Sequence, residues 1–248
     1  MGEAIVFTSG KGGVGKTTTL ANIGTGLSQL DKKVIMLDTD IGLRNLDIVM
    51  GLEDRIRYNL LDILQDKCKA KHAVIRDYRY DNLYMISAAL GQWDLLAYKD
   101  SYINLISKLK QEYDYCLIDC PAGMDTGYQF SISAADRAII VTTPHISAVR
   151  DAGRIIHSLR YNGIEKLQLI INEYDWRMIR KKEMLSQTDI EELLGIKAIG
   201  VVPLDKKIIS SQNYGIPVVS TKAKATSKLL DISKIICQQD MEIIYGAG

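Results

Sequence analysis

Cysteine and proline are both scarce in this chain, with four of each among 248 residues. No two cysteines have the C-x-x-C spacing of a zinc or redox site, so we expect reduced thiols without a metal role. Few prolines and no repeat or low-complexity tract argue against a linker between domains. We therefore predict one domain over residues 1–248, whose cysteines are Cys68, Cys116, Cys120 and Cys237.

Long apolar runs and an excess of one charge are also missing. No segment approaches the roughly 18 apolar residues of a membrane span. The first residues read as a strand rather than as a basic and then apolar leader, so we expect a cytoplasmic protein. A formal net charge of +1 gives no overall basic field, and nonspecific nucleic-acid binding is therefore not indicated. The 47% hydrophobic and 25% charged content is ordinary for a soluble globular protein.

What the sequence does contain is a regular alternation of short β-rich runs and helical patterns, which is typical of βα units around a parallel sheet. Apolar runs such as residues 138–141 do not alternate with polar residues, as expected when both faces of a sheet are covered. We predict an α/β fold with a single doubly wound, mostly parallel sheet and helices on both faces. Strands are expected at 5–8, 34–37, 83–86, 115–118, 138–141, 167–171 and 198–202, with a short one at 218–219; helices are expected at 18–30, 103–112, 148–159, 189–194 and 226–238.

A glycine-rich stretch lies between the first predicted strand and the first predicted helix. It matches G-x-x-x-x-G-K-[ST], the phosphate-binding loop, whose backbone N–H groups surround phosphate oxygens. Lys16 is expected to reach the β- and γ-phosphates, and the Thr17 hydroxyl to bind Mg²⁺. A glycine turn without a ligand is the alternative, and the flanking strand and helix argue against it. The predicted nucleotide-binding residues here are Gly10, Lys11, Gly12, Gly13, Val14, Gly15, Lys16, Thr17 and Thr18.

Acidic and amide side chains follow other predicted strands, at the sheet edge where α/β proteins bind ligands. Asp38 and Asp40 lie two residues apart and point the same way on an extended chain, so one could hold Mg²⁺ and the other orient an attacking water. Asp119 has the position of a second Mg²⁺ ligand, and Gly123 after it could present its N–H to a γ-phosphate. Asn172 could pair with the adenine edge, the alternative being a simple turn residue.

Lys11 is a second lysine within the loop, and one lysine suffices for an ordinary phosphate loop. It is either a solvated loop residue or a cation for phosphates that it cannot reach within its own subunit. The pattern K-G-G-x-G-K-[ST] resembles the MinD/ParA family of deviant Walker A ATPases. That resemblance implies ATP or ADP with Mg²⁺ as ligands and an ATP-dependent homodimer in which Lys11 touches the partner's nucleotide. It also implies catalytic roles for Lys11, Lys16 and Asp40.

Residues 38–47, D-x-D-I-G-L-R-N-L-D, and residues 142–151 resemble the division-site branch of this family. The resemblance implies placement of the division septum and partners of the MinC and MinE/DivIVA kind, with a contact surface altered at Gly153. His145 stands where the family has Glu, and we assign it no role. By the same resemblance Asp38 and Asp119 bind Mg²⁺ with Thr17, and Asp40 positions the hydrolytic water. Asn45 serves the dimer, and Asp151 lies on the partner-binding helix. The adenine pocket is lined by backbone groups of Pro203, Leu204 and Asp205.

Two alternative functions remain open, and two segments depart from the family pattern. A partition or flagellar-number ATPase with DNA or another protein as cargo would use the same loop; DNA is disfavoured, because the basic cluster at 177–182 reads more readily as a solvated helix end. A non-hydrolysing nucleotide-dependent scaffold is the other alternative. The tail at 239–248 lacks the basic amphipathic helix with which the family reaches membranes, so we expect it to be peripheral while membrane-surface contact stays open. The segment 92–99 either packs on the core or contacts a partner.

Overall fold

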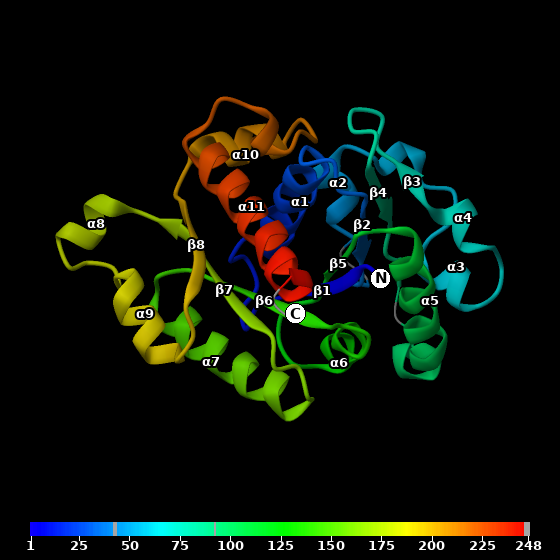
Figure 1. Ribbon diagram of the computed structural model, residues 1–248, viewed down its shortest axis with the longest axis horizontal. Coiled ribbons are helices and arrows are strands. Elements are labelled where there is room, and N and C mark those ends of the chain that lie inside the picture. The colour runs from blue at the N-terminus through cyan, green and yellow to red at the C-terminus, as the bar shows by residue number, and fades with distance from the viewer. Residues whose placement is uncertain (42–43, 92, 246–248) are drawn as a thin grey trace.

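The computed structural model describes residues 1–41, 44–91 and 93–245, with side chains described to residue 238. Its centre is an eight-stranded sheet in the order β3-β4-β2-β5-β1-β6-β7-β8 (Figure 1). Every neighbouring pair is parallel except β3 and β4, which are antiparallel at one edge. The strands are β1 (Glu3–Thr8), β2 (Val34–Asp38), β3 (Ile75–Arg76), β4 (Leu83–Ile86), β5 (Tyr115–Asp119), β6 (Arg137–Thr142), β7 (Leu167–Tyr174) and β8 (Ala198–Pro203).

Helices cover both faces of this sheet. In Figure 1, α1 and α11 lie on one side of the strands, and α6 and α7 lie on the other. The α-helices are α1 (Lys16–Ser28), α2 (Leu46–Met50), α3 (Leu60–Leu64), α4 (Ala70–Ala73), α5 (Lys99–Glu112), α6 (Thr126–Ile132), α7 (Ile146–Tyr161), α8 (Trp176–Arg180), α9 (Gln187–Leu194), α10 (Lys206–Gln212) and α11 (Lys224–Tyr245). Three 3-10 helices, η1 (Glu53–Arg55), η2 (Leu95–Tyr98) and η3 (Val218–Ser220), complete the described elements.

The two faces of the sheet bury separate apolar clusters, and successive residues of β1 show how. Ala4 and Val6 belong to the cluster under α5, α6 and α7, whereas Ile5 and Phe7 belong to the cluster under α1 and α11. All four are fully buried. A strand with both faces covered has no face exposed to solvent, so polar residues need not alternate with apolar ones, which explains the continuous apolar sequence of β1. The predicted doubly wound, mostly parallel fold is therefore confirmed.

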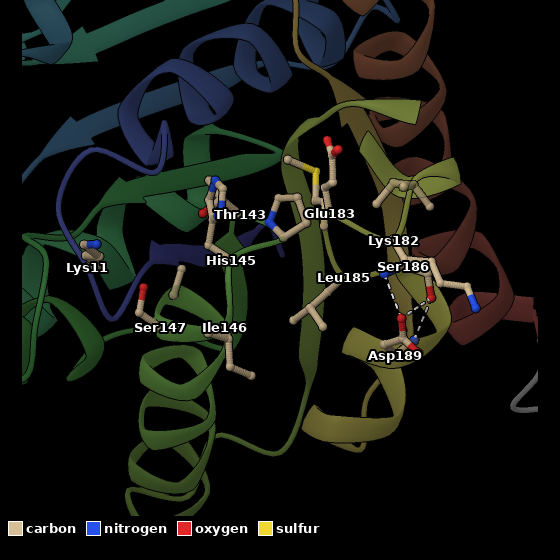
Figure 2. Close-up of a pocket in the computed structure, with 14 residues that line it drawn as sticks. Lys11, Thr143, His145, Ile146, Ser147, Lys182, Glu183, Leu185, Ser186 and Asp189 are labelled. Carbon is tan, nitrogen blue, oxygen red and sulfur yellow. Dashed lines mark hydrogen bonds between the residues drawn. The ribbon is translucent and has the colours of Figure 1, made fainter. Parts of the chain in front are cut away.

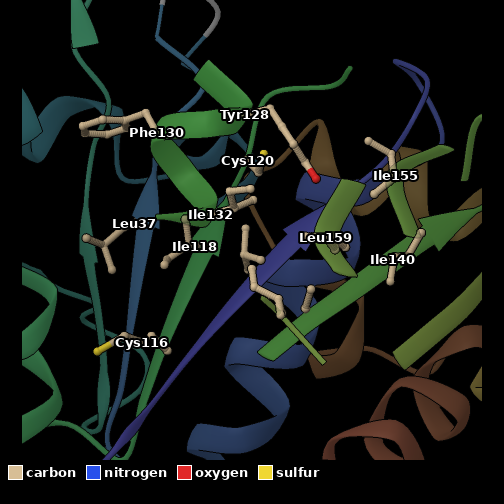
Figure 3. Close-up of a cluster of buried hydrophobic side chains, with 14 of the residues drawn as sticks. Leu37, Cys116, Ile118, Cys120, Tyr128, Phe130, Ile132, Ile140, Ile155 and Leu159 are labelled. Atoms are coloured by element: carbon tan, nitrogen blue, oxygen red, sulfur yellow. The ribbon is translucent and has the colours of Figure 1, made fainter. Parts of the chain in front are cut away.

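Two buried cysteines lie inside the α5–α7 cluster (Figure 3). Cys116 and Cys120 are fully buried among apolar side chains such as Ile118 and Phe130. Burial raises the pKa of both thiols to about 12, because the charged thiolate is poorly solvated there. Both therefore stay protonated at neutral pH and pack as small apolar groups.

Each of the seven longer strands that the sequence predicts is found, with its ends moved by at most three residues. The short strand predicted at 218–219 is wrong: these residues start η3, where Ser220 N–H donates to the Pro217 carbonyl and Thr221 N–H to that of Val218. Val219 N–H instead donates to the Asn22 side chain of α1, so no neighbouring strand could pair there. The two-residue β3 and the short helices α2, α3, α4, α6, α8 and α10 were not predicted.

The predicted peripheral tail at 239–248 falls on side chains outside the described residues. Over the described part of the chain, no helix has both the length and the apolar character that crossing a bilayer requires.

Candidate functional site

A cavity of about 740 Å³ opens at the carboxyl ends of the central strands. It brings together the glycine loop, the end of β2, the end of β7 and the segment after β8, which lie far apart in sequence. Most of the residues predicted to bind nucleotide therefore share one cavity: its lining includes residues 12–18, Asp40, Asn45, Asn172 and 203–205. Of the other predicted site residues, six are not among the lining residues: Gly10, Lys11, Asp38, Asp119, Gly123 and Asp151.

The glycines of the loop have different reasons for lacking a side chain. A Cβ at Gly10 would lie 2.5 Å from the Asp151 carbonyl oxygen, so the loop packs directly on α7. A Cβ at Gly15, where φ is +83°, would lie 2.2 Å from the Asn172 Nδ2 atom. A Cβ at Gly12 would meet no described protein atom within 4 Å. Packing thus does not explain Gly12, whereas a cradle in which backbone N–H groups approach phosphate oxygens does.

Asn172 and Gln212 hold this loop from outside. Asn172 is buried, and its Nδ2 donates to the Val14 carbonyl at 2.9 Å. Its donor therefore holds the loop, and the adenine contact stays a prediction. Gln212 was missed: its Nε2 donates to the Thr18 hydroxyl at 2.5 Å from α10. No local pattern could have shown this contact, because 194 residues separate the two partners.

Lys16 and Asp119 form a buried ion pair at the base of the cavity. The Lys16 Nζ lies 2.6 Å from Asp119 Oδ1, and the two side chains are only 7% and 1% exposed. Burial by itself lowers the pKa of Lys16, but attraction to the Asp119 carboxylate outweighs it, so the pKa is raised. Asp119 thus holds the lysine in its charged form beside the phosphate cradle.

Asp38 stands beside Asp119 on the adjacent strand, at the same register. Its carboxylate accepts N–H groups from Asp40 at 2.9 Å and Leu46 at 3.2 Å, which fixes the chain that leads into α2. Burial first, and the nearby Asp119 charge second, raise the pKa of Asp38 to about 8. Asp38 and Asp119 can both be ionised in this buried position only if a nearby cation compensates their charge.

These carboxylates fit Mg²⁺ by the chemistry of their oxygens. Within the described residues, no group of three His, Cys, Asp or Glu side chains is placed to hold a metal alone. Mg²⁺ in phosphate-binding sites needs fewer protein ligands, since it keeps waters and shares substrate phosphates. Asp38, Asp119 and the Thr17 hydroxyl are the residues here that would hold it.

Asp40 is half-buried between this cavity and a smaller one of about 270 Å³. Burial raises the pKa of Asp40, while the Lys16 charge opposes that shift. The smaller cavity is also lined by Pro121, Asp125 and Trp93. Trp93 is 45% exposed, and its indole N–H donates to the Leu90 carbonyl. Of the segment 92–99, Leu95 packs in the core while Trp93 stands at this cavity; Gln92 lies outside the described residues.

Two predicted ligands have other contacts in this structure. Gly123 N–H donates to the Ser9 carbonyl at 3.1 Å, which ties the loop after β5 to the end of β1. The Asp205 carboxylate accepts N–H groups from Lys207 in α10 and from Lys224 and Ala225 in α11. The Asp205 side chain therefore caps two helices. Burial would raise the pKa of Asp205, but these hydrogen bonds outweigh burial, so its pKa is lowered.

Lys11 lies outside the nucleotide cavity and lines a separate one of about 980 Å³ (Figure 2). The start of α7, with His145 and Ser147, and the connection between α8 and α9 form its other walls. The Lys11 side chain is exposed, and no hydrogen bond or ion pair joins it to any part of the chain that the structure describes. On α7 nearby, Asp151 lies 3.3 Å from the Arg154 guanidinium.

The doubly wound sheet, the glycine loop ahead of α1 and the strand-end carboxylates define a P-loop ATPase. A family model described as an AAA domain matches residues 2–173. The septum site-determining protein MinD of Bacillus subtilis is 45% identical over 246 residues, which cover 98% of this chain and 92% of that protein. The chain belongs to the MinD family of septum site-determining ATPases, as its residues 38–47 predicted.

Solved structures agree with this assignment. The MinD chain of a MinC:MinD cell division complex from Aquifex aeolicus is 38% identical, with a TM-score of 0.89 and coverage of 95% of this chain and 96% of that one. MinD of Pyrococcus horikoshii, in complex with Mg-ADP, is 28% identical with a TM-score of 0.87, covering 97% of this chain and 98% of that one.

Proposed function

We propose that this protein works in septum placement as a Mg²⁺-dependent ATPase that dimerises when ATP is bound. One observation carries the proposal most directly. Lys16 and Asp40 line one cavity, Asp119 pairs with Lys16 at 2.6 Å and Asp38 lies beside Asp119 on the adjacent strand, while Lys11 lines a separate cavity. Lys16 and the carboxylates have the chemistry to bind and cleave a triphosphate. Lys11 is exposed and charged, so it could reach the triphosphate of a second subunit.

Within one subunit, the loop N–H groups and Lys16 bind the phosphates, and Lys16 exchanges its Asp119 partner for phosphate oxygens. Thr17, Asp38 and Asp119 would hold Mg²⁺, which would neutralise part of the phosphate charge. Asp40, which lines the same cavity as the phosphate loop, orients a water and accepts its hydrogen bond. Asn172 and residues 203–205 contribute the adenine end of the site.

Between subunits, Lys11 neutralises charge on the partner's triphosphate, as an arginine finger does. Asn45, at the start of α2 and in the cavity lining, supports the same interface. The relative from Aquifex aeolicus is described in complex with MinC. We extend that to a MinC-like partner on the α7 surface near Asp151, with MinE or DivIVA-type regulators and a membrane surface as further partners of the dimer.

The decisive experiment is sedimentation velocity with ATP or ADP, in the presence of Mg²⁺. Wild-type protein should dimerise with ATP and stay monomeric with ADP. Lys11→Ala should bind ATP within about twofold of wild type, as surface changes do, yet remain monomeric. Lys71→Ala, which removes an exposed lysine on α4, is the matched control and should dimerise normally.

A Lys11→Ala protein that still dimerises with ATP would remove the cross-subunit role. Co-sedimentation with anionic vesicles and with DNA, each with and without ATP, then identifies what the dimer binds. Vesicle binding supports the septum reading, whereas ATP-dependent and salt-sensitive DNA binding would favour a partition role instead.

A further inference from the structure

Two helices that wall the nucleotide cavity touch each other at their far ends. Asn45 at the start of α2, with Ile48 and Val49, lines one side, and α10 lines another with Ile208, Ile209 and Gln212. Beyond the cavity, Gly51 ends α2 and Gly215 follows α10. A Cβ at Gly215 would lie 2.4 Å from Gly51 Cα and 2.8 Å from Gly51 N. The two backbones are therefore in direct contact, at a spacing that any side chain would increase.

One arginine from a third part of the chain joins these two ends. Arg79, in the connection between β3 and β4, donates from Nη1 to the Gly215 carbonyl at 2.7 Å. It also donates from Nη2 to the carbonyl of Met50, the last residue of α2. Carbonyls at a helix end lack partners within the helix, so a cation is well placed there. The guanidinium thus bridges the α2 end and the α10 end.

Asp77 fixes the orientation of that bridge. Its carboxylate is 2% exposed and accepts from Arg79 Nε at 3.0 Å and from Nη2 at 2.7 Å. A two-point contact of this kind holds the planar guanidinium in one direction. Burial would lower the pKa of Arg79, but the Asp77 hydrogen bond and charge outweigh burial and raise it. Arg79 is therefore charged, and its guanidinium contacts Asp77, Met50 and Gly215 at once.

The α10 wall has two further attachments, and both reach functional parts of the fold. Gln212 donates to the Thr18 hydroxyl at the end of the phosphate loop, and Asp205 caps α10 and α11 together. On the α2 side, the first helical residue, Leu46, donates its N–H to Asp38. A change in the spacing between α2 and α10 would therefore be felt at both the phosphate loop and the predicted Mg²⁺ ligand.

We propose that Arg79 is a positioning residue for nucleotide binding, which sets the separation of the α2 and α10 walls although it does not itself line the cavity described here. The inference rests on the proposed nucleotide cavity. Loss of the bridge lets the walls separate and weakens the grip on ATP and ADP alike. The turnover of bound ATP changes less than its binding, because the contacts of Arg79 reach none of Lys16, Asp40 and Asp119 directly.

The test measures the Kd of a fluorescent ATP and a fluorescent ADP, together with kcat, KM and Tm, for three variants. Arg79→Ala removes the bridge, and Gly215→Ala pushes the same two backbones apart without removing a charge. Arg76→Ala is the matched control, because Arg76 pairs with the exposed Asp81 on the same hairpin. We expect Arg79→Ala and Gly215→Ala each to raise both Kd values about tenfold and to change kcat less, since binding must then order walls that the bridge no longer holds in place. The control should match wild type.

A folded Arg79→Ala protein with wild-type Kd values would overturn the proposal, as would an equal rise in Arg76→Ala. A purely structural role would lower Tm without changing the Kd of the folded protein. If Arg79→Ala does not fold, Gly215→Ala and Arg79→Lys decide: lysine lacks the fork that spans Met50, Gly215 and Asp77, so a wild-type Kd in both would refute the bridge. Wild-type protein that fails to bind nucleotide would refute the proposed function itself, and this inference with it.

Discussion

The two lysines of the phosphate loop lie five positions apart and have opposite environments. Lys16 is 7% exposed and lies 2.6 Å from Asp119, whereas Lys11 is exposed and lines a different cavity. Burying a lysine is costly unless a carboxylate accompanies it, and the fold provides one only for Lys16. Lys16 is therefore placed to bind the ligand of its own subunit, whereas Lys11 is free to contact a second molecule.

The largest effect is expected for Lys16→Ala. Nucleotide affinity should fall by about 100-fold or more, because at least two charge-assisted contacts to phosphate are lost. The change also leaves the Asp119 carboxylate buried and unpaired, which should lower the free energy of unfolding by about 3–5 kcal/mol. Isothermal titration with ATP and denaturant unfolding measure the two effects.

The double variant Lys16→Met with Asp119→Asn separates those two consequences. It removes both charges and keeps similar volumes, so stability should recover while nucleotide binding does not. Lys11→Ala, by contrast, should leave the free energy of unfolding unchanged. Equal destabilisation by the two single lysine variants would show that the contrast between them is mistaken.

Much of this contrast was predictable from local sequence, and some of it was not. The G-x-x-x-x-G-K-[ST] spacing identified the loop, and the apolar runs identified the strands whose carboxyl ends carry Asp38 and Asp119. The sequence did not predict the roles of Gln212 and Arg79. Their partners, Thr18 and Gly215, lie 194 and 136 residues away, so only the folded chain brings them together. Asp205 was predicted to line the adenine pocket with backbone groups, which stays a prediction. Its carboxylate also caps α10 and α11, a long-range role that a single short motif cannot reveal.

A further prediction concerns Asp40, whose side chain lies between the nucleotide cavity of about 740 Å³ and the cavity of about 270 Å³. Asp40→Ala should lower the hydrolysis rate by about 100-fold or more, which is the usual effect of removing a general acid or base. ATP binding should persist, since Lys16 and the loop are untouched, so the ATP-bound dimer should accumulate. Single-turnover hydrolysis and sedimentation measure both results. Asp54→Ala, an exposed acidic control on η1, should behave as wild type; unchanged hydrolysis in Asp40→Ala would exclude this residue from the reaction.

The smallest expected effect is a pH dependence that comes from Asp38. Its pKa is raised from 3.8 to about 8 by burial and by Asp119. Between those values the folded state keeps a proton that the unfolded chain has released. This group therefore favours folding most at low pH, and its contribution disappears as the pH rises through 8. Mg²⁺ must displace the same proton, so its apparent affinity should rise up to about tenfold per pH unit below 8.

The rise in Tm caused by Mg²⁺ at pH 6, 7 and 8 measures this competition. The Mg²⁺-dependent shift should grow steadily over the series in wild-type protein. In Asp38→Asn it should be small and flat, because the competing proton and one ligand are both gone. A wild-type shift that is independent of pH would mean that Asp38 is already charged at neutrality. The buried Lys16 charge would then compensate both neighbouring carboxylates, and the internal lysine would have a larger electrostatic role than its single contact with Asp119 indicates.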